Sequence, residues 1–491
     1  MIGAGVSGYD LGETHAVGES FAVTPSVATK GGSMSSSGHT PAAIDYVPES
    51  RVSRRKFMGL AAAGASLAAG SSAMATPAPV SVAQATSVAG RKVTIRVQDW
   101  HLAEKVWGTF ERQMVEDFKK ANPNVELELD AVPYGETLNK FLAQTKAGQP
   151  ADVVYAADAH TVQYLEAGHI LDLASHMKGD RDFTADKFNA AAMKSVTRGD
   201  KVFAVPYAAT PVLLHYNTEM FQKAGLDPTK PPKTWEEFQD ATIKLTRKDP
   251  SGRTVQWGYA PHGKKVIGNM YRLINWFWEN DADILTPDQK GAALNSPQGV
   301  EAFTFLVELG TKHKVFPPQA TDIDPGGARS LLAKEQVAML SGFLGGRAIL
   351  IGENPAMKTK QAFAPLPSRK KKVNALNTEY WTVSSQSKNP EAAVSFVKFL
   401  MSREGQVRMW KAVESIPGRN DAAADSSIEE DKFAKLAVTE LANSRSTPLI
   451  PQWAQIVDVT LDAFQRALLG QVQPKPALDQ AAQQIDAILK R

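Results

Sequence analysis

Strand-like and helix-like segments alternate along the chain from residue 93 onward, and this alternation limits the possible folds more than any other feature. The run VTIRVQ at 93–98 alternates apolar and polar side chains, as a half-buried strand does. Residues 103–121 then place apolar side chains at the spacing of one helix face. The segments NPNVELELDAVP, GETLNKFLAQTKAG and ADVVYAA continue as strand, helix and buried strand. Strands that alternate with helices predict an α/β fold whose parallel sheet is covered on both faces.

A second α/β unit is predicted because the pattern begins again at 201–217 with two strand-like runs, KVFAVPYAATPVLLHYN. Two helix starts follow it. Thr234 and Glu237 have the spacing of a capping box, and Ser296 stands as a cap before Pro297. The 491 residues are enough for two domains, and the sequence has no fixed-period repeat typical of a solenoid.

Residues 53–75, SRRKFMGLAAAGASLAAGSSAMA, are predicted to be an export signal. Their apolar stretch is too rich in glycine and serine for a membrane-spanning helix, and it lacks the polar face of a core helix. The stretch ends in A-M-A, the small-residue form of a cleavage site. The pair Arg54 and Arg55, followed by K-F-M, resembles the twin-arginine signal that exports folded proteins. A cytoplasmic linker rich in alanine and glycine is the alternative.

Residues 1–52 are predicted to be a disordered leader, because they are rich in glycine, serine, threonine and proline. Their start, MIGAGVSG, has the spacing of a dinucleotide-binding loop. No strand precedes its first glycine, however, and no carboxylate follows at the ribose-binding distance, so a nucleotide site is not predicted. A translation start at Val52 or Met34 would explain the leader. Residues 76–91 are expected to form a flexible linker.

The composition excludes several classes of protein. Basic and acidic residues number 55 and 52, a net charge of +3, which is too balanced for a nucleic-acid binder. The absence of cysteine excludes disulfides, thiolate metal sites, cysteine nucleophiles and the acylated cysteine of a bacterial lipoprotein. No H-E-x-x-H or G-x-S-x-G motif occurs, so no metal or cofactor site is predicted. A glycoside-acting enzyme stays an alternative, because its two acids need not be close in sequence.

Five ordered blocks resemble the extracellular solute-binding proteins of ABC importers, in the sugar-binding family that includes maltose-binding protein. The most specific block is VPYAATPVLLHYNTEMFQKAGLDPTKPPKTWEEF at 205–238. The resemblance runs from about Val93 to the C-terminus, and its other blocks lie at 151–173, 295–310, 335–343 and 387–406. It implies a two-lobe periplasmic-binding-protein fold of type II, with the ligand in a cleft between lobes that a hinge joins.

The resemblance also implies that both lobes are discontinuous. The chain is expected to cross between them near 208–212, 380–384 and 435–447. Lobe 1 is then expected to comprise 92–210 plus 383–435, and lobe 2 to comprise 211–382 plus 436–491.

Candidate ligand-binding residues follow the strand ends. Open α/β sheets bind ligands at the carboxyl ends of their strands, and a sugar needs aromatic rings for its faces and polar groups for its hydroxyls. The first strand and the ADVVYAA strand are followed by Trp100, His101, Asp158 and His160. The expected crossings and the resemblance add Tyr207, Asn269, Tyr271, Trp276, Gly342, Phe343, Tyr380, Trp381 and Arg419. Trp276 and Trp278 cannot both face the same side of one helix.

The resemblance implies capture without chemistry, so neither an enzyme nor a cofactor is expected. A carbohydrate (a sugar, an oligosaccharide or a sugar alcohol) would close the lobes, and the closed form would dock on an ABC permease. A polyamine site would need several carboxylates and a phosphorylated polyol would need arginines. Only Asp158 and Arg419 stand out, so a neutral ligand is predicted and those two ligands are the alternatives. A periplasmic monomer exported by the twin-arginine pathway, without lipid anchor or nucleic-acid partner, is expected.

Overall fold

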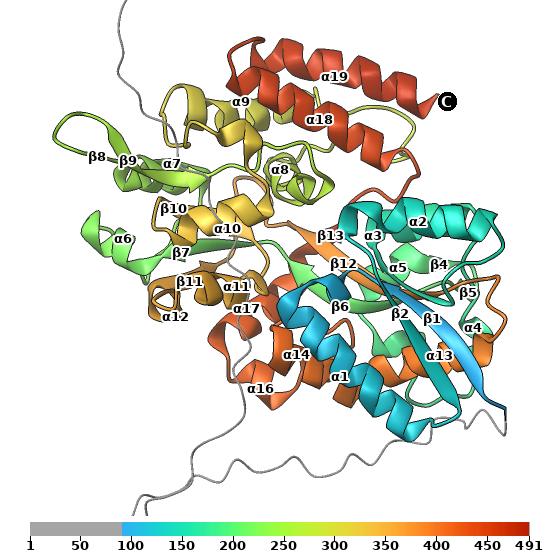
Figure 1. Ribbon diagram of the computed structural model, residues 1–491. Coiled ribbons are helices and arrows are strands. Elements are labelled where there is room, and N and C mark those ends of the chain that lie inside the picture. Colours follow the sequence, from blue (N-terminus) through green and yellow to red (C-terminus); the bar gives the residue numbers. More distant parts are fainter. Residues whose placement is uncertain (1–90, 491) are drawn as a thin grey trace, which may run out of the picture. The chain divides into compact units, whose positions relative to one another are not determined.

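Two β-sheets organise the part of the chain that the computed structural model describes, residues 91–490 (Figure 1). The first sheet has six strands in the order β13-β12-β3-β1-β2, with β6 paired to β12. The second has five strands in the order β11-β7-β10-β9-β8. Helices pack against both sheets, so the predicted two-lobe α/β fold is confirmed. We call the first sheet with its helices lobe 1 and the second lobe 2. The predicted leader, export signal and linker lie outside the described residues, apart from residue 91.

Lobe 1 is built around β1, which has a parallel neighbour on each side. Val93 of β1 pairs with Val125 of β2, and Val97 pairs with Val153 of β3. Every residue of β3 is buried, as expected for a strand covered on both faces. Strand β12 returns antiparallel to both β3 and β6. The strands of this sheet are β1 (Val93–Asp99), β2 (Val125–Ala131), β3 (Val153–Ala157), β6 (Val205–Pro211), β12 (Asn374–Val383) and β13 (Ser444–Ser446).

The helices of lobe 1 contribute apolar faces to its core. In α1, Phe110, Met114 and Phe118 recur at helical spacing, are buried and pack in the same core as β1 and β3. The main helices of this lobe are α1 (Lys105–Ala121), α2 (Tyr134–Lys146), α3 (Asp158–Glu166), α4 (Ala174–Met177), α5 (Ala190–Val196), α13 (Pro390–Leu400) and α14 (Arg403–Val413).

Lobe 2 has a mixed sheet. Its central strand β10 runs parallel to β9 and antiparallel to β7. The strands are β7 (Leu213–Asn217), β8 (Arg247–Lys248), β9 (Thr254–Ala260), β10 (Val337–Gly342) and β11 (Gln361–Ala364). The helices are α6 (Thr218–Lys223), α7 (Trp235–Leu245), α8 (Ile267–Glu279), α9 (Pro297–Thr311), α10 (Pro325–Ala333), α11 (Gly346–Glu353), α12 (Met357–Lys360), α18 (Trp453–Leu468) and α19 (Pro474–Leu489). Between residues 91 and 490, no helix is both long and apolar enough to cross a membrane.

Both predicted helix starts are confirmed. The hydroxyl of Thr234 accepts a hydrogen bond from the Glu237 backbone N–H (3.2 Å), and the Glu237 carboxylate accepts one from the Lys233 backbone N–H (2.7 Å). The reciprocal bond of this capping box thus reaches one residue before the cap. The hydroxyl of Ser296 accepts the N–H of Gly299, and α9 begins at Pro297.

The chain changes sheet where β6 ends and β7 begins, between Pro211 and Leu213. A second change lies between β11 and β12, before Asn374, and not at 380–384, where the resemblance placed it. Residues 376–383 all pair with β3 or β6 within the lobe-1 sheet. We therefore propose to assign 374–382 to lobe 1. In the third expected crossing, α17 (Lys432–Glu440) contacts both β11 of lobe 2 and β6 of lobe 1.

Candidate ligand-binding site

The carboxyl ends of β1 and β3 bring together side chains that lie far apart in the sequence. Trp100 and His101 follow β1, whereas Asp158 and His160 open α3 directly after β3, and all four are buried. The ring centroid of Trp100 lies 4.5 Å from that of Tyr155 and 6.1 Å from that of His160. Four predicted site residues therefore meet. We call this group the lobe-1 cluster; its members are Asp99, Trp100, His101, Tyr134, Tyr155, Asp158 and His160.

Two further carboxyl groups border the lobe-1 cluster and were missed by the sequence analysis. The Tyr207 hydroxyl donates to Oε1 of Glu111 (2.9 Å), and the Tyr155 hydroxyl donates to Oε2 of Glu379 (2.8 Å). Burial raises the pKa of Glu111 to about 8 and that of Glu379 to about 7. Near neutral pH these groups can hold a proton, so each can donate or accept a hydrogen bond. A signal existed for Glu111, which stands three residues before Met114 on the buried face of α1.

Three residues of this region are close enough to hold a metal ion together. One carboxylate oxygen or ring nitrogen from each of Asp99, His101 and Glu111 lies within 4.8 Å of the others. Oδ1 of Asp99 accepts the backbone N–H of His101 (2.8 Å), and Glu111 accepts the Tyr207 hydroxyl. Both carboxyl groups therefore have protein partners already. The same atoms suit the hydroxyls of a carbohydrate equally well.

Four basic side chains gather at the corresponding edge of lobe 2. Since β9 and β10 run parallel, the residues after their carboxyl ends lie at the same edge of the sheet. A Cβ added to Gly342, at the end of β10, would lie 3.3 Å from the His215 ring, so glycine permits this close approach. Burial and the positive charges of Arg329 and Arg272 lower the pKa of His215 to about 3. We call this group the basic cluster; its members are His215, His262, Arg272 and Arg329.

The basic cluster was not predicted, although its neighbours Gly342 and Phe343 were. The Arg272 guanidinium lies 4.2 Å from the centroid of the Phe343 ring. Arg272 occupies α8 and Arg329 occupies α10, and on a helix a lone arginine predicts a solvated side chain. Only the fold shows that Arg272 is buried.

Asp158 and Tyr271 join the two lobes, which was not foreseen although both were predicted site residues. The Tyr271 hydroxyl, on α8 of lobe 2, donates to Oδ1 of Asp158, on α3 of lobe 1. Thr447, which follows β13, donates to Oδ2 of the same carboxylate (3.2 Å). The hydrogen bond between Tyr271 and Asp158 therefore connects the two lobes in this structure.

Stability is expected to fall as the pH rises from about 4 to about 6 because of Asp158. Burial raises the pKa of this carboxyl to about 6, although three hydrogen bonds oppose the shift, and its pKa in the unfolded chain is about 3.9. Below pH 4 the group is protonated in both states. Between the two pKa values only the unfolded chain loses its proton, which favours unfolding, and above pH 6 the effect is complete.

Asp158→Asn should remove this part of the pH dependence. Because opening of the lobes would hydrate the carboxylate, we expect the variant to gain only about 1 kcal/mol above pH 6. Urea unfolding of both proteins at pH 4, 5 and 7 measures the difference. Parallel pH profiles would contradict this role of Asp158.

Trp276 lies in the core of lobe 2. Its ring centroid is 5.4 Å from those of Trp235 and Phe238. Trp278 is also buried, with its indole N–H donating to Asp283 (2.9 Å). Two tryptophans on different sides of α8 are both covered, because other elements surround this helix.

Other predicted site residues lie within the lobes as well. The Tyr380 hydroxyl donates to the Ala192 carbonyl (3.1 Å), and Trp381 packs behind Tyr155 in the lobe-1 core. The side-chain amide of Asn269 donates to two backbone carbonyls of lobe 2. Tyr207 contacts the lobe-1 cluster through its ring, whose centroid lies 5.6 Å from that of Tyr155, and its hydroxyl is bonded to Glu111. Tyr380 and Trp381 are therefore both part of the lobe-1 core.

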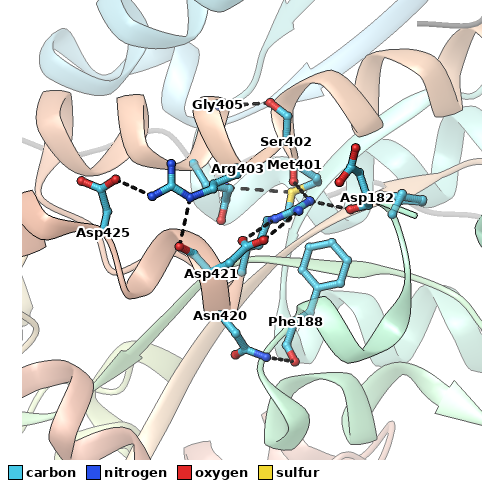
Figure 2. A network of polar contacts seen from close by, with 12 residues as sticks. Asp182, Phe188, Met401, Ser402, Arg403, Gly405, Asn420, Asp421 and Asp425 are labelled. Atoms are coloured by element: carbon cyan, nitrogen blue, oxygen red, sulfur yellow. Dashed lines mark hydrogen bonds and ion pairs between the residues drawn. The ribbon is translucent and has the colours of Figure 1, made fainter. Parts of the chain in front are cut away.

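Arg419 holds backbone segments of lobe 1 together. The residue is only 3% exposed. Its guanidinium forms a bidentate ion pair with Asp421 and donates to the backbone carbonyls of Asp182 and Met401. Figure 2 shows this network, in which Asp421 also faces Arg403. All of these partners are protein groups, and they accept from four of the five N–H donors of the guanidinium.

Arg419→Lys is expected to lower the free energy of unfolding by about 2 kcal/mol, because an ammonium group cannot reproduce the planar fork. Urea denaturation measures this loss. Ligand affinity should stay within about twofold of wild type, since the network lies apart from both clusters. A large loss of affinity with unchanged stability would contradict the structural role.

Comparison with known proteins supports a common architecture. A family model of bacterial extracellular solute-binding proteins matches residues 105–407. A Brucella abortus (strain 2308) protein, named only as a binding protein, is 25% identical over 390 residues, which are 78% of this chain and 90% of that one. The sn-glycerol-3-phosphate-binding periplasmic protein UgpB of Agrobacterium fabrum is 25% identical over 384 residues, 73% and 84% of the two chains. A solved Thermotoga lettingae solute-binding protein, bound with α-D-tagatose, has a TM-score of 0.73 at 24% identity and covers 82% of this chain and 100% of its own.

Proposed function

The chain belongs to the bacterial extracellular solute-binding protein family, and from this premise we propose that it captures a carbohydrate for an ABC importer by closing its two lobes. The observation that carries the proposal is the lobe-1 cluster. Its rings can cover the apolar faces of a sugar, and the neighbouring carboxyl groups can bond the hydroxyls. Trp100 and His101 follow the carboxyl end of β1, and Asp158 and His160 follow that of β3, where open α/β sheets bind their ligands.

We propose that closure of the lobes allows the permease to recognise the liganded protein. A ligand that bridges both lobes favours the closed form, which docks on the permease, while the unliganded protein also populates open forms. The bond between Tyr271 and Asp158 supports this, because it connects the lobes directly. We further propose that Trp100, His101, Asp158 and His160 touch the ligand from lobe 1, and that Tyr271, Gly342 and Phe343 do so from lobe 2.

Two comparisons support a hydroxyl-rich ligand. The Thermotoga lettingae protein is bound with a sugar, and UgpB is named for a phosphorylated polyol. We also propose that the protein works as a periplasmic monomer, exported through the arginine pair at 54–55 and cleaved before Thr76. Sequencing the N-terminus of the exported protein tests the cleavage site.

The ligand class is tested by measuring the melting temperature of the purified protein with one candidate compound added at a time. The candidates are neutral sugars, oligosaccharides, sugar alcohols, sugar acids, sugar phosphates and polyamines. A ligand that binds only the folded state must raise the melting temperature. We expect at least one carbohydrate to do so, and to reduce the radius of gyration in X-ray scattering. A response to polyamines alone would overturn the proposal, and turnover of a glycoside would replace capture with catalysis.

A further inference from the structure

Two arginines of lobe 2, the buried Arg272 and the half-buried Arg329, form no ion pair in the described part of the chain. Arg272 is 4% exposed, and its Nε is buried without a hydrogen-bond acceptor. Its guanidinium lies over Phe343 and donates to the carbonyl of Gly268 in its own helix. The Nε of Arg329 is likewise buried and without an acceptor. Within residues 91–490, neither arginine forms an ion pair at or below 4.0 Å.

These two arginines are neighbours in one group. Burial and the positive charge of Arg329 lower the pKa of Arg272 to about 9. A Cβ added to Gly346 would lie 3.0 Å from Cδ of Arg329 and 3.6 Å from the His215 ring. Both ring nitrogens of His215 and Nδ1 of His262 are also buried without partners. The basic cluster thus combines two fixed positive charges with several unused polar atoms.

The carboxylates of lobe 1 do not satisfy this cluster. Both oxygens of Asp158 accept hydrogen bonds from other groups, and one oxygen of Glu379 accepts the Tyr155 hydroxyl. Glu104, and in lobe 2 Glu353 and Asp324, act electrostatically on Arg329, but none of the three lies within ion-pair distance of it, and Asp324 is paired with Lys264. A buried charge without a partner is costly, and buried charges in proteins are normally paired.

We infer that the basic cluster binds an anionic group of the captured ligand, so that the ligand is a carbohydrate or polyol carrying a phosphate or a carboxylate. The inference rests on the proposed function and gives its ligand a charge. Guanidinium groups suit both anions, because they donate parallel hydrogen bonds to two oxygens. The inference also replaces the expectation of a neutral ligand. That expectation followed from the sequence, in which Arg419 was the only arginine among the candidate site residues.

The two clusters define an orientation for such a ligand. Its anionic group lies against lobe 2, while its hydroxyls face the rings and carboxyl groups of lobe 1. An ionised carboxylate in lobe 1 would repel the anion of the ligand. Burial raises the pKa values of Glu111 and Glu379, and their protonated forms avoid this repulsion. One ligand then touches both lobes and its binding is coupled to closure.

Matched probes test the charge of the ligand by thermal unfolding. Glycerol is compared with glycerate and sn-glycerol 3-phosphate, and glucose with gluconate and glucose 6-phosphate; inorganic phosphate is the anion alone. We expect an anionic member of a series to raise the melting temperature more than its neutral partner does. A larger shift with phosphates than with carboxylates, or the reverse, identifies the anion.

Arg272→Met and Arg329→Met are the informative variants, and Arg466→Met is the control. Arg466 is an arginine on α18 with its side chain 35% exposed, so the control makes the same change in net charge away from the cluster. Both cluster variants should lose the anion-dependent shift. Without ligand, Arg272→Met should melt about 2 °C or more above wild type, because an unpaired buried charge is removed.

The outcomes separate this inference from the proposed function. If neutral and anionic carbohydrates shift the melting temperature equally, the anion site is wrong and carbohydrate capture stands. If only inorganic phosphate produces a shift, and Arg272→Met abolishes it, the anion site stands and carbohydrate capture is wrong. If no anion produces a shift and Arg272→Met lowers the melting temperature of the free protein, Arg272 has a structural role and the inference is overturned.

Discussion

Gly418→Ala is expected to lower the free energy of unfolding by about 4 kcal/mol or more, enough to unfold much of the protein. A Cβ at position 418 would lie 2.0 Å from the carbonyl oxygen of Pro206 and 2.6 Å from its carbonyl carbon. Because a Cβ is fixed to the backbone and the obstacle is also backbone, no side-chain rotation can relieve the overlap. The two segments would have to separate.

That separation would break bonds on both sides of the glycine. Gly418 donates its N–H to the Tyr207 carbonyl (3.0 Å), and its own carbonyl accepts the N–H of Asn189 (2.8 Å). The next residue is Arg419, whose network needs the same backbone path. Pro206 lies near the start of β6, the strand from which the chain leaves the lobe-1 sheet. The substitution therefore disturbs the part of lobe 1 that leads to the first crossing.

Gly352→Ala is the matched control. Gly352 lies in α11, and a Cβ added there meets no atom within 4 Å. Alanine at this exposed helical position should raise the free energy of unfolding by about 0.5–1 kcal/mol. Urea denaturation of both variants gives the comparison. Equal stabilities for the two variants would show that the segments near Pro206 and Gly418 are not packed as closely as described.

Local patterns were sufficient to predict the elements of the fold. Strand β1 is a seven-residue run that alternates apolar and polar residues at its start, and α9 begins where Ser296 and Pro297 indicate a cap. Both signals are local, since they depend on side-chain period and backbone geometry. The direction of β12 could not be predicted in this way. Its pairing with β3 and β6 joins segments more than 150 residues apart.

The site was predictable only where a strand end reveals it. Asp158 and Trp100 follow buried strands, so topology predicts their position. Arg272 and Glu111 lie on helices, and their burial depends on what packs against them from other parts of the chain. Arg419 shows how much a residue's partners matter: the resemblance makes it a site candidate, and in the structure Asp421 and two backbone carbonyls bind its guanidinium. A motif identifies a side chain, whereas its partners decide its role.

Tyr271→Phe is expected to weaken ligand binding about 10- to 100-fold. The hydroxyl of Tyr271 donates to Asp158 across the lobe interface, and a hydrogen bond to a charged group contributes about 1.5–3 kcal/mol. In the proposed closure mechanism this bond forms when the lobes close, so its loss lowers the population of the closed form and leaves the energy of the open form unchanged. Apparent affinity falls by the same factor as the population of the binding-competent state.

Two measurements check this prediction, and one needs no ligand. Calorimetric titration with the carbohydrate that gives the largest thermal shift measures the affinity. X-ray scattering of the free protein should show a larger radius of gyration for the variant, since open forms gain population.

Tyr216→Phe is the control for Tyr271→Phe, because the Tyr216 hydroxyl donates to the Pro228 carbonyl within lobe 2 (2.8 Å). It should cost about 1 kcal/mol of stability and leave affinity unchanged. Equal affinity losses in both variants would mean that the hydroxyl at 271 acts through general stability. If only Tyr271→Phe weakens binding and expands the free protein, the bond to Asp158 couples ligand capture to closure.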